Sequence, residues 1–128
     1  ALASASINML SQSAGDRQFL SNTAWAFATC SLQNAPLMKA ISAAALRILR
    51  AFGPQHISNT AWAFARICCF DTPLMDSLAE ESMKSIGLFD SQGLTNTAWA
   101  FAKLTLMHEP LLAAISAEAL ARINQLRG

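Results

Sequence analysis

Nine polar side chains recur at a fixed spacing along this chain. An asparagine occurs three times at intervals of 37 residues, with a glutamine four residues before it and a threonine or basic residue seven residues after it. An amide side chain can pair with the edge of a nucleobase, and a cation can contact a phosphate. Modular RNA readers use two or three side chains per helical repeat in this manner. The candidate binding residues are Gln18, Asn22, Thr29, Gln55, Asn59, Arg66, Gln92, Asn96 and Lys103.

Catalysis and metal binding have little support in the same sequence. It contains no nucleophile with a plausible base, no glycine-rich phosphate loop and no paired histidine and carboxylate. Cys30, Cys68 and Cys69 lack a metal-binding spacing, so we expect them to be buried thiols. His56 and His108 are predicted in loops or at helix ends rather than as ligands. We therefore expect no catalytic residue, no cofactor and no metal.

The composition favours helices and a nearly neutral surface. Of the 128 residues, 53% are hydrophobic, many of them alanine, and tyrosine and valine are absent. The net charge is +1, from 9 basic and 8 acidic residues. A protein that neutralises many phosphates is usually more basic, so this charge weighs against strong nucleic-acid binding. No apolar run is long enough for a membrane span, and we expect none.

A repeated seven-residue motif, NTAWAFA, carries the three asparagines. It begins at Asn22, Asn59 and Asn96, without an insertion between copies. Each unit predicts a hairpin of two helices. The first helices are expected at about 16–32, 54–69 and 91–106, and the second helices start at Pro36, Pro73 and Pro110. Asp71 and Thr72 are candidate N-terminal caps for the helix that starts at Pro73. The fold class is therefore all-α, an α-solenoid of stacked antiparallel helix hairpins.

The repeat spacing also divides the chain. Residues 1–14 are expected to be the second helix of a partial preceding repeat, followed by repeats at 15–52, 53–89 and 90–128. Terminal repeats of a solenoid usually have a polar outer face, and neither end of this chain shows one. We therefore expect further repeats or a partner to cover both ends.

The motif residues have alternative roles within the fold. Each asparagine could hydrogen-bond a neighbouring helix and fix the packing of the repeats instead of contacting a ligand. Trp25, Trp62 and Trp99 are predicted to be core anchors rather than platforms for base stacking. On that interpretation, replacing Trp62 with alanine costs as much as any large core truncation.

The second unit, PQHISNTAWAFARICCFDTPLMDSLAEESMKSIGLF, resembles the octotricopeptide repeat of organellar proteins in algae. Its period of 37 residues is even more similar to the heptatricopeptide repeat of apicomplexan and related protists. The resemblance rests on Asn59, on Trp62 with Ala63, and on Pro73 with Leu74, and it covers nearly the whole chain. It implies an α-solenoid, a chloroplast or mitochondrial location, and RNA binding.

Two functions are consistent with these features. The first is an organellar RNA-binding protein, acting in RNA processing, stability, translation or ribosome assembly without catalysis of its own. The second is a structural scaffold that binds protein subunits within a large organellar complex. The resemblance and the amide-plus-cation pattern favour RNA as the partner, whereas the weak net charge favours protein partners.

Overall fold

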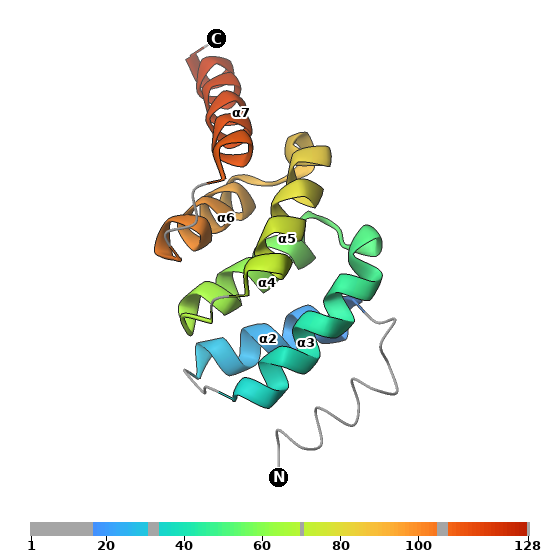
Figure 1. Ribbon diagram of the computed structural model, residues 1–128. Coiled ribbons are helices and arrows are strands. Elements are labelled where there is room, and N and C mark those ends of the chain that lie inside the picture. The colour runs from blue at the N-terminus through green and yellow to red at the C-terminus, as the bar shows by residue number, and fades with distance from the viewer. Residues whose placement is uncertain (1–16, 31–33, 70, 105–107, 128) are drawn as a thin grey trace.

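The computed structural model describes residues 17–30, 34–69, 71–104 and 108–127, and every regular element within them is helical. The predicted all-α class is confirmed. The predicted partial repeat at 1–14 lies outside the described residues. The helices are α2 Arg17–Thr29, α3 Ala35–Ile48, α4 Pro54–Arg66, α5 Thr72–Lys84, α6 Ser91–Lys103 and α7 Glu109–Arg127, with short 3-10 turns η1 Leu49–Ala51 and η2 Ile86–Leu88 (Figure 1).

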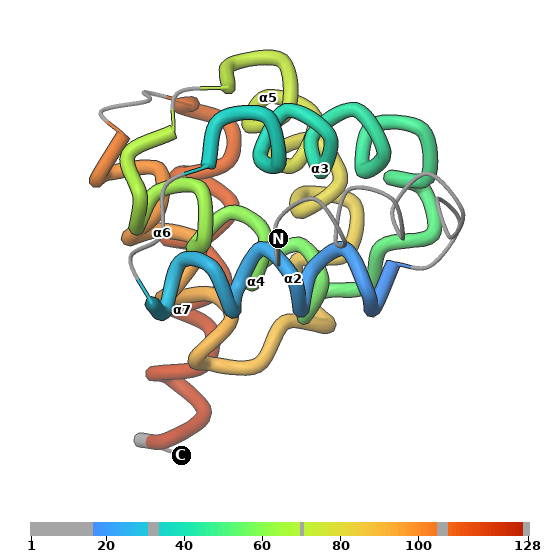
Figure 2. Tube along the Cα trace, turned by 90° about the horizontal axis from the view of Figure 1, so that it is seen from below, coloured from blue at the N-terminus to red at the C-terminus, as the bar shows by residue number. Residues whose placement is uncertain are grey.

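The helices form two layers. In one layer α4 lies between α2 and α6, and in the other α5 lies beside α3 (Figure 1). Figure 2 views this stack from the end that carries α2 and α3. Each of the hairpins α2–α3 and α4–α5 contributes one helix to each layer, so the predicted α-solenoid of stacked antiparallel hairpins is confirmed.

The second helices begin where the sequence predicts, within one residue. α3 and α5 start one residue before Pro36 and Pro73, because the capping residue lies two positions before each proline. The side chain of Asn34 accepts a hydrogen bond of 3.0 Å from the Leu37 amide, and Asp71 accepts one of 3.1 Å from the Leu74 amide. Asp71 is thus the predicted cap, and Thr72 is instead the first helical residue.

The first helices end about three residues earlier than predicted, and the end of α4 shows why. The Cys69 amide donates to the Phe64 carbonyl at 2.8 Å, and the Cys68 amide donates to the Ala65 carbonyl at 3.0 Å. This pair of bonds is the Schellman motif, which ends a helix with one residue in the left-handed region. That residue is Cys68, with φ of 54°, where glycine is usual.

We expect Cys68→Gly to raise the free energy of unfolding by about 0.5–1 kcal/mol. A side chain in the left-handed region costs roughly 1–2 kcal/mol, and the greater entropy of unfolded glycine offsets part of the gain. Denaturation in urea measures the change. Cys68→Ala is the matched control, since it removes the thiol but keeps Cβ and should leave stability unchanged. Equal stability of the two variants would show that no strain is stored here.

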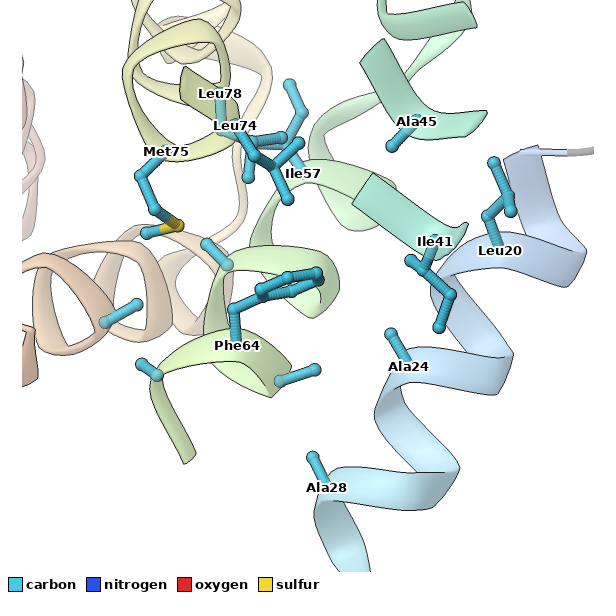
Figure 3. Close-up of a cluster of buried hydrophobic side chains, with 14 of the residues drawn as sticks. Leu20, Ala24, Ala28, Ile41, Ala45, Ile57, Phe64, Leu74, Met75 and Leu78 are labelled. Atoms are coloured by element: carbon cyan, nitrogen blue, oxygen red, sulfur yellow. The ribbon is translucent and has the colours of Figure 1, made fainter. Parts of the chain in front are cut away.

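The core lies between the two layers. Figure 3 shows Phe64 of α4 surrounded by aliphatic side chains from neighbouring helices. The second helices each bury one stripe of side chains, which comprises Leu37, Ile41, Ala45 and Leu49 for α3 with η1, and Leu74, Leu78 and Ser82 for α5. The buried side chains labelled in Figure 3 are Leu20, Ala24, Ala28, Ile41, Ala45, Ile57, Phe64, Leu74, Met75 and Leu78.

The C-terminal helix α7 is much less buried than α3 or α5. Leu111 is fully buried, but Ile123 is 46% exposed and Leu126 is 86% exposed. Arg122 pairs with Glu118 and donates to the Phe89 carbonyl, which ties α7 to the turn before α6. In Figure 1 the far end of α7 projects beyond the two layers. The second half of α7 is therefore largely exposed.

The prediction of three buried thiols is wrong. Cys30 and Cys68 are exposed, because they lie just after the last turns of α2 and α4, while Cys69 is partly buried against the core. Burial raises the pKa of the Cys69 thiol, and the nearby Asp71 carboxylate acts in the same direction. The described residues contain no cluster of three histidine, cysteine or acidic side chains that could hold a metal ion. Among those residues, no helix is both long and apolar enough to cross a membrane.

Candidate functional site

The three motif tryptophans form a continuous row along the layer of α2, α4 and α6. The ring centroids of Trp25 and Trp62 are 6.5 Å apart, and those of Trp62 and Trp99 are 6.4 Å apart. The ring planes are tilted by 30° and 34°. We call Trp25, Trp62 and Trp99 the tryptophan row. It presents aromatic surface at intervals set by the repeat.

The prediction of core anchors is wrong for Trp25 and Trp99, which are exposed, whereas Trp62 packs against the core. Trp25 is 47% exposed, Trp99 is 40% exposed and Trp62 is half-buried against the core. Each indole stands three residues after its asparagine, and this spacing places both side chains on the same side of the helix. The interior side of the helix carries Phe64 and small residues such as Ala61 instead.

A groove between α4 and α6 lies next to this row. Its volume is about 570 Å³, and it brings together four of the nine predicted binding residues: Gln55, Asn59, Gln92 and Asn96. None of these four amide side chains has a hydrogen-bond partner among the residues that the structure describes. We call it the amide groove; its lining is Trp25, Pro54, Gln55, Ser58, Asn59, Leu88, Asp90, Gln92, Gly93 and Asn96.

The corresponding amides of α2 are engaged. Gln18 Nε2 donates to Asn22 Oδ1 at 2.9 Å, and Gln18 Oε1 lies 3.0 Å from His56 Nε2. His56 Nδ1 accepts a hydrogen bond of 3.0 Å from the Gly53 amide, so its Nε2 carries the proton and donates to Gln18. These contacts join α2 to the start of α4. The contact between helices is made by Gln18, whereas Asn22 accepts its hydrogen bond from Gln18 of its own helix.

The position seven residues after each asparagine, which differs between the repeats, lies at the end of the layer opposite to the amide groove. Thr29, Arg66 and Lys103 are the last residues of α2, α4 and α6, and all three are exposed. The Thr29 hydroxyl donates to the Trp25 carbonyl at 2.8 Å. Neither Arg66 nor Lys103 forms an ion pair with a described residue. Each cation is two helical turns, about 10 Å, beyond its asparagine and does not line the amide groove.

Histidine placement follows the prediction of helix ends. His56 lies in the first turn of α4, and His108 precedes α7, where its Nδ1 accepts from the Leu111 amide at 3.2 Å. Sequence reasoning missed the tryptophan row, although the indoles share the 37-residue period of the asparagines. It also missed that His56 has Gly93 as its counterpart one unit later.

Comparison with known protein families gives a match that covers nearly the whole chain. The model of the RNA-editing substrate-binding complex 6 protein family matches residues 2–127. No curated protein matches the chain. Members of the family are generally non-catalytic subunits of a mitochondrial RNA-editing complex. Since the match covers nearly all of its residues, the chain belongs to the RNA-editing substrate-binding complex 6 protein family.

Proposed function

We propose that this chain is an RNA-binding subunit of a mitochondrial RNA-editing assembly. It holds single-stranded RNA along the layer of α2, α4 and α6 and performs no catalysis of its own. The observation that carries the proposal is the tryptophan row, with two of its indoles 40% or more exposed. Aromatic platforms bind unstacked bases with about 1–3 kcal/mol per base. A row of large exposed aromatic rings is unusual at a protein surface and marks a candidate contact site.

The polar residues complete this surface. The amides of the groove are placed beside the row, where they can contact base edges. Arg66 and Lys103 are exposed at the ends of neighbouring helices and form no ion pair with a described residue, so they can contact phosphates. Thr29 supplies only a hydroxyl at the same position. The weak net charge of the chain is compatible with this arrangement because stacking, unlike phosphate contact, does not need cations.

We further propose that the hairpins are repeats of the octotricopeptide or heptatricopeptide type, with unit boundaries at 15–52, 53–89 and 90–128. The support is the common register of α2, α4 and α6, which start at intervals of 37 residues. A preceding partial repeat at 1–14 remains part of the same proposal.

A scaffold that binds protein subunits is the second candidate, and α7 favours it. Leu120, Ile123 and Leu126 are 60%, 46% and 86% exposed on this one helix. Exposed apolar residues grouped in this way commonly mark a protein interface. Both functions can coexist in one subunit, since α7 and the tryptophan row belong to different parts of the molecule.

RNA binding as a function is tested with the unmodified chain and labelled single-stranded RNA. We expect binding at low salt, quenching of indole fluorescence, and a slope of log affinity against log salt of about −1.4, or −0.7 for each of two phosphate contacts. The quenching is informative because the row contains all three tryptophans of the chain.

Double-stranded RNA of the same sequence is the matched control. It should bind more weakly, because its bases are stacked inside the duplex and cannot reach the indoles. If single-stranded RNA fails to bind at low salt, while a protein subunit binds through α7, the scaffold function replaces RNA binding.

A further inference from the structure

The two junctions within the layer of α2, α4 and α6 differ in the residue that follows the repeated glutamine of the later helix. His56 stands in the first turn of α4, and the residue one unit later, in the first turn of α6, is Gly93. The flanking glutamine and asparagine are the same at both places. Other positions differ as well, among them Pro54 and Ser91, but His56 is the one whose side chain bonds the neighbouring helix.

At the first junction the histidine engages the neighbouring helix. Its ring bridges the Gly53 amide and Gln18 Oε1, and Gln18 in turn donates to Asn22. Both amides of α2 are thus oriented by contacts inside the protein. A ligand at this junction would have to break that chain of hydrogen bonds.

Glycine leaves the second junction open. A Cβ at Gly93 would lie 3.0 Å from Asp90 Oδ1 and 3.3 Å from Phe89 Cδ2, so the position has no room for a side chain without movement of its neighbours. The Gly93 amide donates to Asp90 Oδ1 at 2.6 Å, which fixes the backbone that lines the groove. The result is the amide groove of about 570 Å³ between α4 and α6.

The lining of the groove selects the chemistry of its ligand. Among the described residues that line it none is basic, and the one carboxylate, Asp90, would repel a phosphate. Its four amides offer both donors and acceptors, which suit the edge of a nucleobase. Trp25 and Pro54 provide apolar surface on which the face of a base can pack.

We propose that the amide groove binds one unstacked nucleobase of single-stranded RNA and reads its edge, whereas the junction between α2 and α4 does not. Asn59, Asn96 and Gln92 make the edge contacts, and the phosphates lie outside the groove. This inference rests on the proposed function. It assigns base recognition to one of the two junctions instead of equally to each repeat.

The test uses the full chain and four homopolymeric single-stranded RNAs of about ten nucleotides each. We expect the unmodified chain to prefer one homopolymer. Asn59→Ala with Asn96→Ala should weaken binding of that RNA by about tenfold, the effect of one good amide-to-base contact, and flatten the preference. The salt slope should stay unchanged, because no phosphate contact is lost. A role in packing alone predicts no change of base preference.

Two further variants sharpen the test. Asn22→Ala is the matched control: it removes the same motif residue at the closed junction and should change affinity less than about twofold. Gln92 is exposed on α6, so Gln92→Ala keeps the fold and should flatten the preference even if the double variant is unstable. Melting temperatures identify any loss of folding.

The outcomes separate the inference from the proposed function. If the unmodified chain binds none of the RNAs, the proposed function fails and the inference fails with it. If RNA binds but the groove variants keep the base preference of the unmodified chain, only the inference fails. A uniform loss of affinity for all four RNAs also overturns it. The same holds if the groove variants lose a protein partner and retain RNA, because a protein segment is then the occupant.

Discussion

Phe64→Ala is expected to lower the free energy of unfolding by about 3–5 kcal/mol, the usual range for truncating a buried phenylalanine. The Phe64 side chain is 0% exposed. It lies on the middle helix of its layer, among side chains of α2, α3 and α5 (Figure 3). No neighbour is free to fill the space that the ring leaves. Denaturation in urea and the melting temperature measure the loss.

Trp62→Ala is the informative comparison on the same helix. Although tryptophan is larger than phenylalanine, Trp62 keeps part of its surface exposed, so we expect a cost of about 2–3 kcal/mol, below the range for a fully buried ring. Phe64→Leu keeps much of the core volume and should cost less than about 1.5 kcal/mol. A loss for Trp62→Ala equal to that for Phe64→Ala would place the tryptophan row in the core and remove the main support for RNA binding.

Much of the fold was predictable because its signals are local. Asn34 and Asp71 cap helices two residues before a proline, and these features lie within a few positions of each other in the sequence. The repeat then sets the stacking, since identical units pack on one another in the same way. Helix ends were less predictable: α4 ends at a Schellman motif formed around Cys68, a residue type that gives no signal of a left-handed conformation.

The tryptophans show a different limit. The motif is apolar over most of the helix circumference, so its pattern did not indicate which arc is covered by the second layer. The structure buries the arc of Ala61 and Phe64 completely and covers that of Trp62 only in part. The tryptophans were predicted in the core because large apolar residues generally prefer the interior, and this preference gave the wrong result for the exposed ones.

The candidate site was predictable as a set of residues but not as an arrangement. Spacing places Asn59 and Arg66 on the same side of α4, and the structure keeps both accessible. Which amides can contact a ligand depends on contacts between units. Gln18 is hydrogen-bonded to His56, whereas Gly93, at the position equivalent to His56 one unit later, has no side chain that could form such a bond. Such a difference is visible only when the side chains of neighbouring helices are placed together.

Arg66→Ala combined with Lys103→Ala is expected to weaken single-stranded RNA binding by about 20-fold at 0.1 M salt and to reduce the salt slope by about 1.4. The reason is the loss of two phosphate contacts, each worth about 0.7 in slope for a single strand. Both side chains are exposed and have no ion-pair partner among described residues, so folding stability should not change. Base preference should also persist, since the amide groove is intact. Affinity measured across a salt series gives both quantities.

Arg47→Ala with Arg50→Ala is the matched control. These two cations are exposed near the end of α3 and in η1, in the other layer, so this variant loses the same net charge from a different surface. If long-range attraction by net charge governs binding, both double variants lose affinity equally. If RNA follows the layer of α2, α4 and α6, only the variant at Arg66 and Lys103 loses slope, because counterions are released only where phosphates are contacted. An unchanged slope in that variant would remove these two residues from the proposed interface and leave the tryptophan row and the amide groove as its only parts.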